Sequence, residues 1–444
     1  MRYLILLALF SSCSIDQAIN DADLIVSSNK VILMTDKRKA QPLSIAIKDK
    51  RIAWIGSHQD AKHIQGKHID FGNQAVLPGF IDAHGHASYL AFATQVANIA
   101  SPPVGKINTI NELQAELKKF IKKSNLKPGE WIIGLGYDDS LLEEQRHPTK
   151  DDLDKVSTEH PIYLIHVSAH LGAANTLGLS LANINSETQD PPGGKIRRYE
   201  NSSKPNGVFE ETAAYPLQQL AMSAYKDPIG SVKQAMEIYA RNGITTAQDG
   251  ASSLETIDLM QAADAQGMID LDIISYPIGQ NGLDKNLNSI NFGSYEGRLK
   301  IGGIKLILDG SPQGKTAYLT EPYYKPPHSE SDSYKGYPLI PQSEVSKWVK
   351  KYADLNIPIM AHANGDAAAD MLIKAVKDAD ITSDHRTIMI HAQTVREDQL
   401  DQMKKLKIIP SYFSTHTFYW GDWHRDSVFG EDRAMRISPT KSTL

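Results

Sequence analysis

The chain has 444 residues, of which 41% are hydrophobic and 22% charged, as in an ordinary globular enzyme. The formal net charge of −5 leaves no basic surplus for binding nucleic acid. Beyond the first dozen residues no apolar run is long enough to span a bilayer. The length suits one large barrel with a smaller domain beside it.

The first residues differ in character from the rest of the chain. A short basic start (residues 1–2) is followed by an apolar stretch (residues 3–10), and two serines then precede Cys13, the only cysteine. This layout is typical of a secretory signal, and Cys13 stands where a bacterial lipoprotein carries its lipidated cysteine. We therefore expect a lipid anchor at Cys13, membrane attachment through it, and a place in the bacterial cell envelope, on the periplasmic side or the cell surface. The alternative is an ordinary cleaved signal peptide with an incidental cysteine.

Residues 22–75 read as short strands separated by turns. The apolar or alternating runs are 24–26, 31–33, 44–47 and 51–56. Short strands at this spacing predict a small N-terminal β-sandwich domain.

From about residue 235 onward, helical patterns alternate with apolar strands. Helix candidates at 231–242 and 257–266 end at Gly243 and Gly267, and Ser343 is expected to cap a third. An apolar strand follows each of them. This alternation is typical of βα units around a parallel sheet and predicts a barrel over residues 76–444.

Between the two regions, residues 87–230 give mixed signals and are interpreted as a large insertion over the active-site face of the barrel. Residues 110–123 predict a helix, and residues 131–133 and 162–166 predict strands. Residues 185–207 are rich in Gly, Pro, Asn and Ser and read as a long surface loop.

The strongest chemical motif is His84-Gly85-His86. Side chains two residues apart on an extended strand point the same way, so the two imidazoles can converge on one cation. On its own a His-x-His motif leaves open that the two histidines are incidental.

The segment that leads into the motif, Pro78-Gly79-Phe80-Ile81-Asp82, favours metal binding over two incidental histidines. Together they resemble the amidohydrolase superfamily, specifically the amidohydrolase-3 (YtcJ-like) branch that includes N-substituted formamide deformylases. The resemblance runs over about residues 22–440. It implies an α/β fold, a TIM-like (β/α)8 metal-dependent hydrolase barrel.

The resemblance also implies three further metal ligands. Lys305 matches a fourth-strand lysine that becomes carboxylated and bridges two metals, while His362 and His391 match the ligands after strands five and six. With His84 and His86 they would hold two divalent ions, zinc by the imidazole and oxygen donors. A salt-bridged lysine, structural histidines and a single-metal site stay open as alternatives.

Softer matches point to the substrate pocket. The stretches around Tyr137 and His170 resemble segments that the branch carries before its second half, and Glu211 lies in a third such segment, residues 207–213. We expect these three side chains to line the pocket, with purely structural roles as the alternative.

One feature of the family has no counterpart here. In the family an aspartate ending the eighth strand binds the first metal and moves the water's proton. The sequence given reaches residues 434–440 and stops at Leu444, so we expect a chain without that strand and aspartate, with no assignable general base and doubtful turnover.

The resemblance implies hydrolysis of an amide-type carbon–nitrogen bond, other than a peptide bond, in a small molecule by metal-activated hydroxide. No nucleic-acid partner is expected. The alternative from another class is a non-catalytic envelope lipoprotein that binds a metal or a ligand without turning it over.

Overall fold

The computed structural model describes residues 19–35, 39–222, 225–280, 283, 287, 290–327, 330–381 and 384–444. Cys13, the predicted lipidation site, lies outside these residues. The internal contacts divide the chain into two compact units, with the boundary in the sequence between Phe80 and Ile81. Each unit is described by itself.

The N-terminal unit is built around one sheet with strand order β3-β2-β1-β4, and β5 pairs with β1. Its elements are β1 (Asp21–Val31), β2 (Gln41–Lys48), β3 (Arg51–Gly56), α1 (His58–Ala61), β4 (Gln65–Asp70) and β5 (Ala75–Val76). In β2 the alternate residues Ser44 and Ala46 are buried, whereas in β1 every third residue from Ala22 to Val31 is buried. Ile25 and Ala46 are fully buried in a cluster with Ala61 and Ile64. The prediction of a small β-sandwich is confirmed only in its coarser part, a β-rich N-terminal domain, since the described strands of this unit form one sheet.

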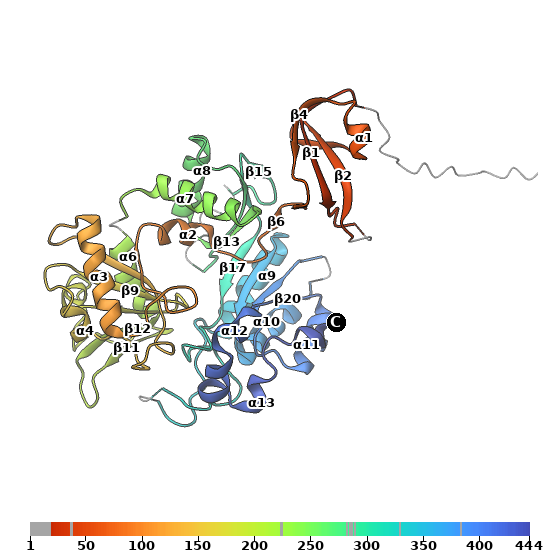
Figure 1. Ribbon diagram of the computed structural model, residues 1–444. Coiled ribbons are helices and arrows are strands. Elements are labelled where there is room, and N and C mark those ends of the chain that lie inside the picture. Colours follow the sequence, from red (N-terminus) through yellow and green to blue (C-terminus); the bar gives the residue numbers. More distant parts are fainter. Residues whose placement is uncertain are drawn as a thin grey trace, which may run out of the picture. The chain divides into compact units, whose positions relative to one another are not determined.

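The second unit contains the strands of the predicted barrel (Figure 1). They are β6 (Phe80–Ile81), β13 (Ile244–Ser252), β14 (Asp272–Pro277), β17 (Ile304–Ile307), β18 (Ile359–Ala363), β19 (Ile388–His391) and β20 (Ile409–Tyr412). β13 pairs parallel with β14, and β17 to β20 pair parallel in chain order. A parallel bridge between Ile278 and Lys305 joins the two groups of strands. The TIM-like α/β fold is therefore confirmed.

Helices separate the barrel strands, as the glycine and asparagine stops predict. They are α2 (Ala87–Ala93), α7 (Pro228–Arg241), α8 (Leu254–Ala265), α9 (Gln342–Asp354), α10 (Asp366–Asp378) and α11 (Glu397–Leu406), and β15 (Tyr295–Glu296) and β16 (Leu299–Ile301) extend the sheet beside β14. β13, β18, β19 and β20 are thus flanked by helices on both sides in sequence, and β14 and β17 on one side. The C-terminal ends of these parallel strands face the same rim.

The predicted cap of α9 is wrong. Ser343 lies inside the helix, and the N-cap is Pro341, which makes no side-chain capping bond. The carbonyl oxygen of Pro341 accepts the backbone N–H groups of Glu344 (3.0 Å) and Val345 (3.3 Å). The ring of Pro341 fixes its φ angle at −68°, and with ψ at 154° the residue has the extended conformation of an N-cap. The helix therefore begins after Pro341 without a capping hydroxyl.

An inserted sheet lies between α2 and α7 in sequence, with strand order β11-β12-β10-β9-β8-β7. Its elements are β7 (Ala97–Asn98), α3 (Ile110–Ser124), β8 (Ile132–Tyr137), α4 (Lys150–Asp154), β9 (Ile162–His166), β10 (Leu171–Ala174), α5 (Thr176–Leu181), β11 (Gly194–Arg198), β12 (Pro205–Glu211), the 3₁₀ turn η1 (Thr212–Ala214) and α6 (Tyr215–Met222). These elements form the orange to yellow-green part of the ribbon in Figure 1.

The long surface loop predicted over residues 185–207 is wrong in its second half. β11 and the first residues of β12 form an antiparallel pair there. Ile196 and Phe209 are buried in the core of the inserted sheet, and the side chains of Arg197 and Glu210 form an ion pair (2.5 Å). A single apolar residue, Ile196, is too weak a signal to reveal a strand in this stretch, whereas pairing with β12 stabilises β11.

The C-terminal segment after β20 is helical. It comprises α12 (Thr415–Trp423), a π-helical turn η4 (His424–Val428), α13 (Glu431–Ala434) and α14 (Thr440–Thr443). Trp420 and Phe429 bury their rings in this segment. Among the helices of the described residues, none has both the length and the apolar character needed to cross a membrane.

Asn175 makes four hydrogen bonds to backbone groups of the inserted segment. Its Oδ1 accepts the backbone N–H groups of Ile162 (2.9 Å) and Gly178 (2.9 Å), and its Nδ2 donates to the carbonyls of Ser157 (3.0 Å) and His160 (2.9 Å). Asn175→Ala leaves these backbone groups unpaired, three of them at buried residues, and removes the N-cap of α5. We expect a loss of unfolding free energy on the order of 3 kcal/mol, measured by chemical denaturation.

The matched control for this substitution is Asn185→Ala, which removes the same amide from an exposed turn. It should change stability by less than about 0.5 kcal/mol. Equal effects of the two substitutions would contradict the capping role of Asn175.

His424 predicts how stability responds to acid. Burial lowers the pKa of His424 to about 4, whereas its unfolded value lies near 6.5. The unfolded chain therefore takes up a proton in this interval that the folded chain excludes. The stability contribution is complete above pH 6.5 and is lost as the pH falls toward 4, by about 3 kcal/mol.

Thermal or urea unfolding between pH 4 and 7 measures this loss. His424→Gln should flatten the profile in that interval, while His63→Gln, at an exposed position, should leave it unchanged. A profile with the same slope in His424→Gln would show that other groups dominate.

Candidate metal centre at the barrel rim

The His-x-His motif lies between β6 and α2. The backbone N–H of Asp82 donates to the carbonyl of Thr246 in β13 (2.9 Å), and His86 forms an isolated bridge with Asp249. Both contacts hold the motif against β13. The imidazole centroids of His84 and His86 lie 5.0 Å apart, so the spacing does bring the two rings together.

The neighbours of His84 determine which ring nitrogen is free. Gln248 donates from Nε2 to the carbonyl of Ala83 (3.2 Å), so its Oε1 is the atom that faces His84 Nδ1 (2.8 Å). Since Oε1 can only accept, Nδ1 carries the proton and Nε2 carries the lone pair. Nε2 is buried and has no hydrogen-bond partner among the described residues. Burial also lowers the pKa of His84 to about 4, so the ring is neutral and able to bind a cation.

His362 and His391 end the neighbouring strands β18 and β19. Their ring centroids are 4.6 Å apart, and the ring of His391 lies 5.4 Å from that of His84. His362 Nε2 lies 3.1 Å from the carbonyl oxygen of Gly310 and 2.8 Å from the amide nitrogen Nδ2 of Asn364. Burial holds the pKa of both histidines well below the usual range. Four predicted ligands thus form one connected group of neutral imidazoles.

The backbone at this rim is strained. His391 has φ of 73° and Ala392 has φ of 46°, so two consecutive residues with side chains occupy the left-handed region. Each such residue costs on the order of 1 kcal/mol, and such conformations gather at functional sites. The strain is consistent with a chain path set by the site at the end of β19.

Lys305 lies in β17 and is 2% exposed. Burial lowers the pKa of its amine to about 7. No ion pair joins this amine to a carboxylate among the described residues, and its positive charge is one cause of the lowered pKa of His84. A buried amine without a counter-ion is costly, so its environment favours a neutral or chemically modified form.

The inserted sheet adds His170 and Glu211 to the rim. His170 Nδ1 pairs with Glu211 Oε2 (2.7 Å), and the His170 ring lies 4.9 Å from that of His362. Glu211 has φ of 50° and is 3% exposed, and its Oε1 has no hydrogen-bond partner among the described residues. Two of the three predicted pocket residues therefore lie beside the imidazole group.

The third, Tyr137, lies elsewhere. Its hydroxyl contacts Nδ1 of His147 (3.1 Å), and its ring packs against His166 (5.2 Å). Tyr137 is fully buried in the inserted sheet, and none of its described contacts is with the four rim histidines.

Sequence reasoning missed Asp309, four residues beyond Lys305. Its carboxylate accepts the backbone N–H groups of Tyr318 (3.0 Å), Asn364 (3.0 Å) and Gly365 (2.8 Å). It thereby joins the loop after β17 to the loop after β18, beside His362. Complete burial outweighs these three bonds and raises the pKa of Asp309 to about 7. In the sequence, the position of Asp309 just after the end of β17 was the signal that could have drawn attention to it.

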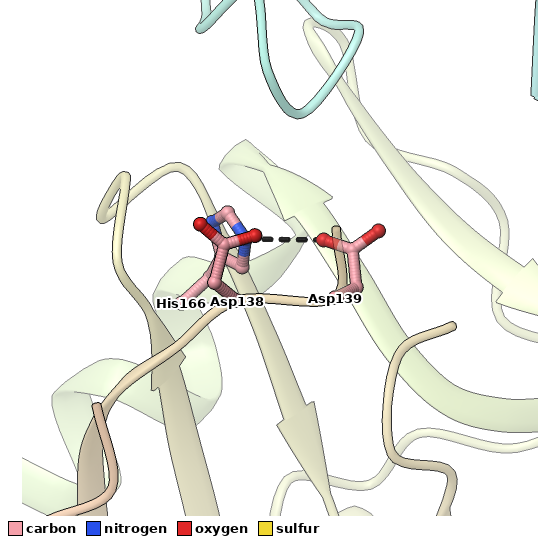
Figure 2. A group of neighbouring side chains, drawn as sticks. All are labelled: Asp138, Asp139 and His166. Carbon is pink, nitrogen blue, oxygen red and sulfur yellow. Dashed lines mark ion pairs between the residues drawn. The ribbon is translucent and has the colours of Figure 1, made fainter. Parts of the chain in front are cut away.

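Sequence reasoning also missed a second group of possible metal ligands, formed by Asp138, Asp139 and His166 in the inserted sheet (Figure 2). Their ligand atoms all lie within 4.8 Å of one another. The pair of aspartates directly after an apolar strand was the signal that could have drawn attention to it.

The chain is similar to a known protein family and to several of its members. Residues 67–444 match the family described as the Amidohydrolase family. The chain is 26% identical over 439 residues to the N-substituted formamide deformylase of Arthrobacter pascens, covering 95% of this chain and 78% of that protein. It is 23% identical over 403 residues to the putative amidohydrolase YtcJ of Bacillus subtilis, covering 85% and 71%.

Among solved structures, an uncharacterized metal-dependent hydrolase from Pyrococcus furiosus has the same fold. The TM-score is 0.67 at 23% sequence identity, covering 94% of this chain and 82% of that one. The family match spans most of the chain, including all five predicted ligands. The chain therefore belongs to the amidohydrolase family and is a metal-dependent hydrolase of that family.

Proposed function

We propose that this chain hydrolyses an amide-type carbon–nitrogen bond in a small molecule at a two-metal centre. His84, His86, Lys305, His362 and His391 would hold the two ions. The observation that carries the proposal is the buried Nε2 of His84, which has no hydrogen-bond partner in the described part of the chain and lies within a group of neutral imidazoles at the barrel rim. This donor set suits zinc.

The residues present fit such a centre. Gln248 fixes the tautomer of His84 so that a lone pair is available, as hydrogen-bonded partners commonly do for ligating histidines. When bound, the metal ions would lower the pKa of a water molecule and polarise the carbonyl of the substrate.

We propose further that Lys305 is carboxylated. A neutral lysine amine adds to carbon dioxide and releases one proton, which gives a carbamate with anionic oxygen donors. Burial of the amine without a carboxylate partner supports this, because the neutral amine is the form that reacts.

The His170–Glu211 pair would position the substrate. Its unpartnered Glu211 Oε1 can accept a hydrogen bond from an N–H group, and a secondary amide carries one. The overall reaction takes up one water and releases a carboxylic acid and an amine. The deformylase relative makes N-substituted formamides the first substrates to test.

The test measures metal and turnover on the same sample. We expect two divalent ions per chain by elemental analysis, and release of a primary amine from N-benzylformamide that stops on chelation and returns with Zn²⁺. A metal content at or below one ion per chain would exclude the two-metal centre. A lipid anchor at Cys13 and a place in the cell envelope stay proposals that rest on the N-terminal sequence alone.

A further inference from the structure

The group formed by Asp138, Asp139 and His166 lies at one edge of the inserted sheet. β8 and β9 are adjacent parallel strands, and Tyr137 stands opposite His166 in their register. The carboxyl ends of the two strands therefore meet at the same edge, where the two carboxylates and the imidazole lie together (Figure 2).

Two atoms of this group are buried without a hydrogen bond. His166 is 0% exposed, and its Nε2 lies 3.1 Å from Asp139 Oδ1 and 3.9 Å from Asp138 Oδ1. Despite these distances, neither His166 Nε2 nor Asp139 Oδ1 has a hydrogen-bond partner among the described residues. Buried polar atoms are nearly always bonded, so an ion pair whose two buried atoms form no aligned hydrogen bond is a candidate site for a ligand.

The remaining atoms of the group are held in place by other residues. Asp138 Oδ1 accepts the backbone N–H (2.9 Å) and hydroxyl (2.6 Å) of Ser140, and Oδ2 accepts the indole N–H of Trp420 in α12 (2.6 Å). Second contacts of this kind orient metal ligands and are typical of metal sites.

The tautomer of His166 can adapt to a cation. Its Nδ1 lies 2.8 Å from the hydroxyl of Ser168 and 3.2 Å from the backbone N–H of the same residue. The backbone contact favours the proton on Nε2 while no cation is bound. A cation on Nε2 displaces that proton, and Nδ1 can then donate to the Ser168 hydroxyl.

The surrounding charges leave an excess of negative charge. Arg197 forms an ion pair with Glu210, and the positive charge of Lys315 also acts on Asp139. The carboxylates of Asp138, Asp139 and Glu210 therefore share two cations, Arg197 and Lys315. Nε2 of His147 lies 3.4 Å from Oδ2 of Asp139.

We propose that Asp138, Asp139 and His166 bind one divalent transition-metal ion at a site separate from the rim centre. Two carboxylates and one imidazole suit Zn²⁺ or Mn²⁺. Among the described residues, no hydrogen bond, ion pair or ring contact joins these three side chains directly to the rim histidines. Through Asp138 and Trp420 the ion would stabilise the contact between the inserted sheet and α12.

The metal content of folded variants tests the proposal. The purified full chain, loaded with Zn²⁺ and dialysed, is compared with Asp139→Asn and His166→Gln by elemental analysis, with folding checked by circular dichroism. Each variant should hold one ion fewer per chain than the wild type. Asp152→Asn is the matched control, because it removes a carboxylate charge that is bonded to Arg146 in the same inserted segment. It should keep the wild-type content.

The His391→Ala background separates this site from the rim centre. An ion that survives in His391→Ala and disappears in the double variant with Asp139→Asn supports the proposal even if the rim centre binds no metal. Unchanged metal content in both folded variants, Asp139→Asn and His166→Gln, overturns it and leaves the proposed function standing. If one variant fails to fold, the other decides the question.

Discussion

Replacement of Lys305 by alanine is expected to lower kcat for amide hydrolysis by about 10³-fold or more. Lys305 is buried in β17, which pairs with β18, the strand that carries His362, and the proposed carbamate is the anionic oxygen ligand of the centre. Alanine removes every donor atom at that position. The measurement is the rate of amine release, together with metal content.

Two further readouts distinguish a ligand from a structural lysine. Acetate or propionate should restore part of the activity of Lys305→Ala, because a small carboxylate can enter the vacated space. Labelled bicarbonate should give a carbamate carbon signal in the wild type that is absent in the variant. Lys300→Ala, in β16, serves as the control and should retain activity. A Lys305→Ala variant with full activity and full metal content would refute the bridging role.

Replacement of His391 by alanine should remove metal from the rim and lower kcat by a similar factor, about 10³-fold. Its ring lies between those of His84 and His362, at 5.4 Å and 4.6 Å. Loss of the central imidazole therefore affects both sides of the group. Elemental analysis and amine release measure the two effects.

The same strand region offers a matched control. His385 lies three residues before β19, where it bonds to Thr387 and to the carbonyl of Leu406, whereas His391 ends the strand. His385→Ala should keep the metal content and the turnover of the wild type. Equal loss in both variants would indicate a general effect on folding instead of loss of a ligand.

The barrel could be predicted because its signals are local. Apolar strands such as residues 359–363 and helix stops such as Gly243 and Gly267 each reveal themselves within a few residues. The inserted sheet was harder to predict. β11 is stabilised by pairing with β12, and Ile196 is its one fully buried apolar residue. Its stability comes from partners that a local pattern does not show.

By itself the sequence determined the positions of the candidate ligands. His84 and His86 are two residues apart, and His362 and His391 each end an apolar strand, so strand geometry alone sends them to one rim. It also carried the resemblance that the family match confirms.

Only the tertiary structure decided which polar groups of the inserted sheet meet the barrel. His170 lies beside His362, while Tyr137 does not, although Tyr137 ends β8 and His170 directly precedes β10 of the same sheet. The structure also brought Asp138 to Trp420, 282 residues away. Such contacts depend on how complete elements pack, and no spacing within one strand or helix encodes them.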